Sequence, residues 1–89
     1  MTQQQYIDLF SSAYDQCKRM LSLFPNNAAL LSIQKQLDYL LALAKREITD
    51  TSRIKEVCIG VLTARELDNL GEDVEIFYEI QNAAKFFRL

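Results

Sequence analysis

Apolar residues recur at helical spacing through most of the chain, and polar or turn-forming stretches interrupt the pattern. The clearest stretch is residues 28–48, AALLSIQKQLDYLLALAKREI, where steps of three and four between apolar residues keep one face of a helix buried. That face comprises Leu30, Ile33, Leu37, Leu40, Ala44 and Ile48, widened by Leu31, Leu41 and Leu43. A helix this apolar is predicted to be surrounded on more than one side.

The same spacing predicts a first helix that begins near residue 3. Thr2 and Gln5 have the separation of a capping box, in which each residue satisfies a free backbone amide of the other. Pro25 disfavours helical geometry at Phe24 and ends this helix, and one of the two asparagines that follow can cap the next. The predicted inward residues are Tyr6, Phe10, Ala13, Cys17, Met20 and Phe24.

Two further helices are predicted beyond the turn-forming residues 49–52. The third covers residues 53–67, with Ile54, Val57, Cys58, Val61 and Leu62 inward. Gly60 within it either lets another helix approach closely or marks a kink, and Gly71 suits a left-handed turn. The last covers residues 72–87 and buries Val74, Phe77, Ile80, Ala84 and Phe87. Short connections favour antiparallel neighbours, so the pattern predicts an all-α fold, a compact antiparallel bundle of about four helices.

Composition supports one small helical domain over residues 1–89. The chain is 49% hydrophobic and has two Gly and one Pro, and 89 residues suffice for one compact core but not for a deep cavity as well. The net charge of −2 with no basic cluster argues against nucleic-acid binding. No apolar run has the length of a membrane span, and the polar N-terminus does not resemble a secretory signal. We therefore expect a cytoplasmic protein.

The residues that usually carry catalysis or bind cofactors are scarce. The chain has no histidine, and its two cysteines, Cys17 and Cys58, lie on predicted apolar faces. Both are interpreted as small core residues in a reducing compartment rather than as a disulfide. No glycine-rich loop is present to bind a phosphate. The sequence therefore predicts no enzyme activity, no metal site and no cofactor.

Charge and aromatic residues suggest two surfaces for contact with a partner. Between Glu66 and Glu79 the chain carries six acidic residues and no Lys or Arg. Several of them can stabilise the first turn of the last helix, where negative charge is favourable by about 0.3–1 kcal/mol each. The alternative is a docking surface for a basic partner. Tyr39 and Tyr78 are either half-buried packing residues or interface anchors.

Several short segments resemble one known family. Four segments are similar, in the same order, to stretches of a small immunity protein family. They are Tyr6-Ile7-Asp8; the set Leu30, Leu31, Ser32, Lys35, Gln36, Leu37 and Tyr39; Ile59-Gly60; and the run Arg65-Glu66-Leu67-Asp68. These proteins protect Pseudomonas from its own type VI secretion effector, an NAD(P)+ glycohydrolase. The resemblance covers about residues 6–80, and residues 83–89 depart from the family pattern.

The resemblance implies an all-helical protein that binds a cognate toxin domain encoded nearby and sterically blocks its active site. The toxin would be an NAD(P)+ glycohydrolase or a related ADP-ribosyl-transferring enzyme. We expect the contact on exposed residues of the second helix and the acidic stretch: Asp38, Tyr39, Glu66, Asp68, Glu72, Asp73 and Glu75.

Two other functions fit the same sequence. The chain could be a secretion chaperone or helical adaptor that holds a partner segment in an apolar groove, with Phe86, Phe87 and Leu89 forming an exposed patch. It could also use surplus apolar surface to form a homodimer. The sequence leaves monomer and homodimer undecided.

Overall fold

The first helix, α1, has the boundaries that its sequence predicts. In the computed structural model, which describes residues 1–88, α1 spans Gln3–Leu23. The capping box is present: the Gln5 amide donates to Thr2 Oγ1 at 3.1 Å, and the Thr2 amide donates to Gln5 Oε1 at 2.8 Å. The helix ends at Phe24, immediately before Pro25. Five of the predicted inward residues are buried, namely Tyr6, Phe10, Ala13, Cys17 and Met20, and Phe24 is half-buried.

The second helix, α2, spans Ala28–Ala44 and is shorter than predicted. Asn27 caps it by accepting a hydrogen bond from the Leu30 amide at 3.0 Å. The chain leaves the helix through Arg46, whose φ of 61° is left-handed, and the Arg46 and Glu47 amides donate to Leu43 and Ala42 carbonyls. These two bonds form a Schellman motif, in which Arg46 occupies the usual glycine position. The prediction that the helix reaches Ile48 is therefore wrong, and Ile48 is 39% exposed.

The predicted third helix over residues 53–67 is also wrong, because the chain breaks in its middle. A 3-10 turn, η1, spans Ile54–Glu56, and Val57 is extended before α3 spans Ile59–Leu62. A π-helical segment, η2, continues over Thr63–Leu67. The break rotates the buried face, so Ile59, Gly60, Thr63 and Leu67 are inward while the predicted core residue Val61 is 54% exposed. Cys58, also predicted inward, is half-buried.

Two glutamine side chains satisfy the backbone at this break. Gln36 on α2 accepts a hydrogen bond from the Cys58 amide at 2.9 Å. Gln81, from the last helix, accepts one from the Gly60 amide at 2.9 Å and donates to the Val57 carbonyl at 3.1 Å. A Cβ on Gly60 would lie 3.0 Å from Gln81 Cγ, so glycine permits the close approach that was one of the two interpretations of this residue.

The last helix, α4, spans Glu75–Phe86 and begins later than residue 72. Glu72 and Asp73 therefore precede the helix instead of lying in its first turn. Asp73 nevertheless stabilises its start, since its Oδ1 accepts a hydrogen bond from the Glu75 amide at 3.1 Å. Gly71 has the predicted left-handed conformation, with φ of 78°.

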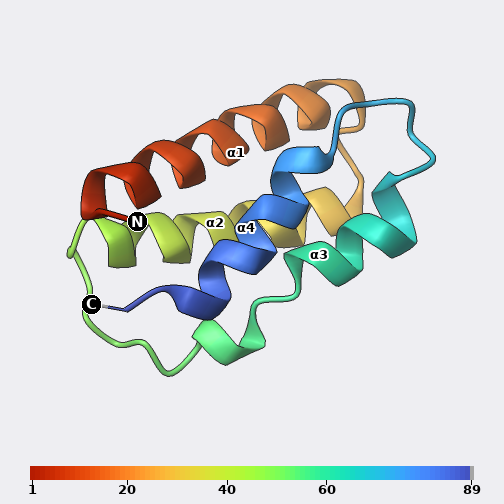
Figure 1. Ribbon diagram of the computed structural model, residues 1–89. Coiled ribbons are helices and arrows are strands. Elements are labelled where there is room, and N and C mark those ends of the chain that lie inside the picture. The colour runs from red at the N-terminus through yellow and green to blue at the C-terminus, as the bar shows by residue number, and fades with distance from the viewer. Residues whose placement is uncertain (89) are drawn as a thin grey trace.

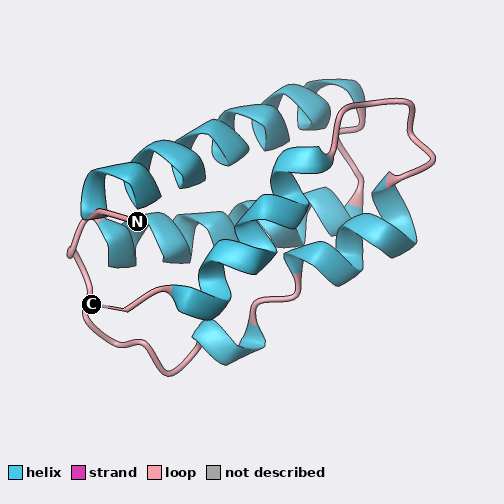
Figure 2. Ribbon diagram, in the orientation of Figure 1, coloured by secondary structure: helices cyan, strands magenta, loops and turns pink. Residues whose placement is uncertain are grey.

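The helices enclose one hydrophobic core, and the prediction of an all-α bundle is confirmed (Figures 1 and 2). Within residues 1–88 there are four α-helices and no strand. The α1 and α2 helices lie side by side in opposite directions, and α4 packs against α1 and α3. Phe87, just beyond α4, is 3% exposed and closes the core with an edge-to-face contact to Tyr6 at 4.9 Å between ring centroids.

The arrangement places the first and last described residues, Met1 and Arg88, at one end of a molecule of about 34 × 20 × 20 Å (Figure 1). The connection from α2 to η1 lies at the same end, and the connection from η2 to α4 lies at the other. Within the described chain, no helix is both long enough and apolar enough to cross a membrane.

The glutamine bridge leads to a stability prediction. Replacing Gln81 by alanine leaves the Gly60 amide and the Val57 carbonyl without their partner, so we expect Gln81→Ala to lower the free energy of unfolding by about 2 kcal/mol. Asn82→Ala, at the exposed neighbouring position, should change it by less than about 0.5 kcal/mol. Urea unfolding followed by circular dichroism measures both, and equal stability of the two variants would contradict the bridging role.

Candidate functional site

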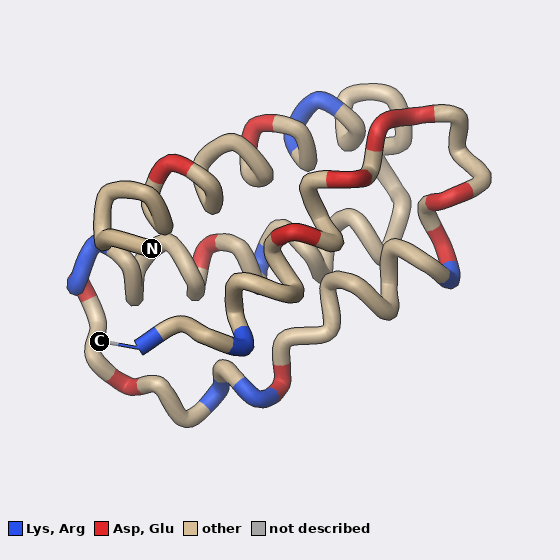
Figure 3. Tube along the Cα trace, viewed as in Figure 1, with Lys and Arg blue, Asp and Glu red and all other residues tan. Residues whose placement is uncertain are grey.

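Five of the seven predicted contact residues lie together on the connection between η2 and α4 and at its two ends. We call this set the acidic surface: Glu66, Asp68, Glu72, Asp73 and Glu75. Figure 3 shows the acidic residues gathered along this connection, at the end of the molecule away from the termini. Glu72 is half-buried and the other four are exposed.

Hydrogen bonds fix this connection to two helices. The Tyr78 hydroxyl on α4 donates to the Asp68 carboxylate, with distances of 3.0 and 2.9 Å to its two oxygens. This bond to a carboxylate raises the pKa of Tyr78 above its ordinary value. On the other side, Gln16 Nε2 on α1 donates to the Asp73 carbonyl at 2.7 Å. The acidic surface is therefore presented by an anchored segment.

No carboxylate of the acidic surface forms an ion pair within residues 1–88. Among residues 1–88 one ion pair is present, between Arg53 and Glu56 at 4.0 Å, and it lies elsewhere. Exposed carboxylates without cationic partners produce a local negative potential, which attracts a basic surface.

Asp38 and Tyr39 are not joined to the acidic surface. Asp38 is exposed on α2 and lies near Tyr14 of α1. Burial, and next the Asp38 charge, raise the pKa of Tyr14.

Burial, with a contribution from the Asp38 charge, raises the pKa of the Cys17 thiol to about 11. Cys17 is fully buried and its thiol contacts the Leu30 carbonyl at 3.3 Å, so this cysteine is a core residue, as predicted.

Tyr39 holds the connection between α2 and η1. Its hydroxyl donates to the Asp50 carbonyl at 2.7 Å and accepts from the Arg53 amide at 3.3 Å. The Arg53 guanidinium lies 5.7 Å from the centre of the Tyr39 ring, within the range of a cation–π contact. The ring also lines a small depression of about 330 Å³ together with Lys35 and Glu56. Tyr39 therefore has a structural role in addition to any contact with a partner.

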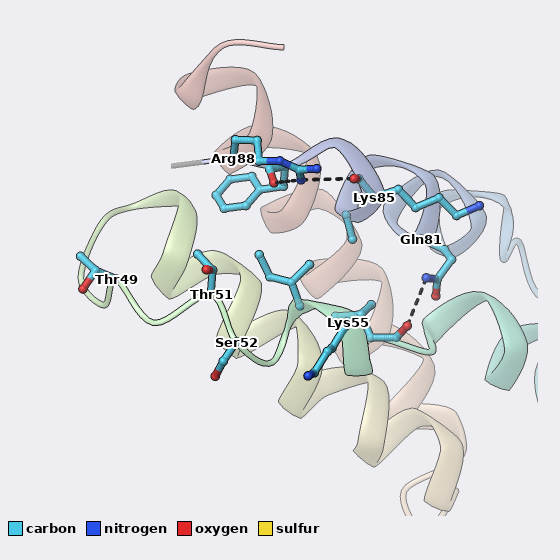
Figure 4. A pocket seen from close by; sticks show the side chains of 11 residues that line it. Thr49, Thr51, Ser52, Lys55, Gln81, Lys85 and Arg88 are labelled. Carbon is cyan, nitrogen blue, oxygen red and sulfur yellow. Dashed lines mark hydrogen bonds between the residues drawn. The ribbon is translucent and has the colours of Figure 1, made fainter.

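The structure contains a second surface that the sequence analysis missed. A groove of about 900 Å³ runs between residues 49–57 and the C-terminal half of α4 (Figure 4). Ile54, Val57, Ala84 and Phe87 provide its apolar side chains, and Lys55, Lys85 and Arg88 provide positive charge. The three cationic residues come from segments about 30 positions apart, so no local sequence signal marked them as one group.

The role of Tyr39 can be tested without a partner. We expect Tyr39→Phe to cost about 1 kcal/mol of stability, because the hydroxyl makes two hydrogen bonds to the connection. The same variant should speed hydrogen exchange of the Arg53 amide while leaving the α1 amides unchanged. Nuclear magnetic resonance measures both sets of amides, and an unchanged Arg53 amide would show that the hydroxyl does not hold this segment.

Comparison with known proteins identifies the family. A family model described as Tsi6 matches residues 5–88, which is nearly the whole chain and includes most of the C-terminal stretch expected to depart from the family. No curated protein and no solved structure gives a significant match. The long match agrees with the resemblance found in the sequence and with the helical bundle. The chain therefore belongs to the Tsi6 family of type VI secretion immunity proteins.

Proposed function

We propose that this chain protects its cell by binding a cognate type VI toxin domain and sterically blocking that domain's active site. The toxin is an NAD(P)+ glycohydrolase or a related ADP-ribosyl-transferring enzyme. The observation that carries the proposal is the family match over residues 5–88. The toxin gene is expected beside the gene for this chain, and the complex is expected to form in the cytoplasm.

The bundle is physically suited to act as a blocking subunit. Its core side chains are fully packed and its acidic connection is anchored at both sides, so little of the chain has to become ordered on binding. Binding therefore loses less conformational entropy. A standard tight interface needs about 800 Å² from each partner, a small part of the 5370 Å² that this chain exposes. In this mechanism the chain excludes substrate and performs no chemistry.

The acidic surface is our proposed contact with the toxin. Its unpaired carboxylates would face a basic patch, which is a common feature of sites that bind phosphate-bearing substrates. Asp38 and Tyr39 remain proposed contacts on α2. Asp38 lies near Tyr14 and Tyr39 is hydrogen-bonded to Asp50, and neither of these neighbours belongs to the acidic surface. We therefore expect the acidic surface to contribute more than these two residues.

One of the three residues in the apolar patch proposed for the chaperone alternative is buried. Phe87 is buried in the core, and Leu89 lies outside the described residues. Phe86 is 69% exposed. One exposed phenylalanine does not distinguish a chaperone from an ordinary soluble domain, since scattered apolar residues are common on protein surfaces.

Co-expression tests the proposed function directly. The C-terminal domain encoded by the adjacent gene is expressed in bacteria with and without this chain, and growth and cellular NAD+ are followed together. We expect the toxin domain alone to stop growth and deplete NAD+, and this chain to restore both. Rescue of growth without any earlier fall in NAD+ would retain immunity but reject the glycohydrolase. A harmless neighbour would contradict the immunity proposal.

Charge reversal tests the acidic surface. We expect the combination of Glu72→Lys, Asp73→Asn and Glu75→Lys to weaken the toxin complex by tenfold or more, and most of the effect should disappear at high salt. Asparagine at position 73 keeps the side-chain oxygen that accepts the Glu75 amide. Asp8→Lys with Asp15→Lys on exposed positions of α1 is the control and makes a similar, slightly smaller change in net charge. Titration calorimetry measures the affinities, and equal binding by both variants would exclude the acidic surface.

A further inference from the structure

The groove between residues 49–57 and α4 has cationic side chains on both sides. Lys55 lies on η1, whereas Lys85 and Arg88 lie at the end of α4 and just beyond it (Figure 4). All three are exposed, and none forms an ion pair with an Asp or Glu of residues 1–88. Arg88 donates hydrogen bonds to the Phe87 and Lys85 carbonyls, at 2.7 and 3.3 Å, which keep its guanidinium along one side of the groove. Three cationic residues therefore line this groove, in a chain whose net charge is −2.

The shape of the groove favours an extended chain segment over a compact small molecule. The groove is partly open to solvent, whereas sites for small ligands enclose most of the ligand surface. Its floor is apolar and includes Val57 and Phe87, both of which belong to the core cluster. Residues 49–51 belong to no helix, and no backbone amide of these three residues donates a hydrogen bond within the described chain. Such amides can pair with an extended peptide laid beside them.

Charge and shape together specify the occupant. Lys55 and Lys85 favour acidic side chains by charge attraction, and the apolar floor of the groove favours apolar side chains. In an extended chain, successive side chains point alternately to opposite sides, so one segment can satisfy both. We propose that this groove binds an extended acidic segment of the cognate toxin, with apolar side chains on the floor and carboxylates against Lys55 and Lys85. This inference rests on the proposed function, because it takes the toxin as the partner.

The groove and the acidic surface are separate contacts. Figure 3 shows several basic residues around the end that holds the N-terminus and the segment after α2, interspersed with acidic ones, whereas the acidic surface lies toward the opposite end. The molecule is about 34 Å long, so a toxin that contacts both surfaces must present a basic patch to one and an acidic segment to the other. Substitutions at sites this far apart should have additive effects on affinity.

Cross-linking of the unmodified complex tests the inference first. A carbodiimide joins a lysine amine to a carboxylate only when the two are in contact, and the full chain is mixed with the toxin domain from the adjacent gene. We expect intermolecular links from Lys55 or Lys85 to toxin Asp or Glu residues, located by mass spectrometry. Lys18, exposed on α1, is the internal control and should form no such links. A stable complex without links at Lys55 and Lys85 would overturn the groove assignment and leave the proposed function standing.

A pair of matched variants gives the second test. Lys55→Glu with Lys85→Glu should weaken toxin binding by tenfold or more, whereas Lys18→Glu with Lys45→Glu, at exposed positions, makes the same change in net charge and should change affinity less than threefold. Thermal unfolding confirms that both variants are folded. Equal affinities for the two variants would overturn the groove as a binding site. Failure of the wild-type chain to bind the toxin at all would overturn both the proposed function and this inference.

Discussion

The side-chain amides of Gln36 and Gln81 hold the backbone where the chain leaves helical geometry between η1 and α3. Without those bonds the Cys58 and Gly60 amides would lie half-buried or buried with no partner, at a cost of about 1–3 kcal/mol each. Because Gln36 comes from α2 and Gln81 from α4, the break also joins the two helices on either side of it. The positions of η1, α3 and the groove all depend on this bridge.

Breaking the third helix has a consequence for the surface of the molecule. A continuous helix over residues 53–67 would place Lys55 on a regular helical face, whereas the break turns η1 toward the end of α4. There Lys55 lies across the groove from Lys85 and Arg88. The same fold carries the acidic surface at the other end, anchored through Gln16 and Tyr78. The acidic surface and the cationic groove therefore lie toward opposite ends of the molecule, although its net charge is only −2.

This arrangement suits a protein whose proposed task is to bind another protein quickly and in one orientation. Complementary charge speeds association and disfavours wrong orientations, while the packed core limits the entropy lost on binding. Binding and steric blocking require no catalytic residues. Membership of the Tsi6 family gives the biological setting, and the two charged surfaces give separable hypotheses about how the toxin is held.

The sequence by itself determined the helical class, the boundaries of α1 and the start of α2, because the Thr2–Gln5 capping box, Pro25 and Asn27 act through neighbours within a few residues. It also located the acidic stretch, which is contiguous in the chain. It did not determine the end of α2, where Arg46 takes a left-handed conformation, or the break at Val57, whose partners are 21 or more residues away in sequence. Nor did it show the cationic groove. The spacing of apolar residues along the chain shows which face of a helix is buried. Hydrogen bonds between side chains and backbone that are distant in sequence determine where a helix is interrupted, and therefore which charged residues lie close together.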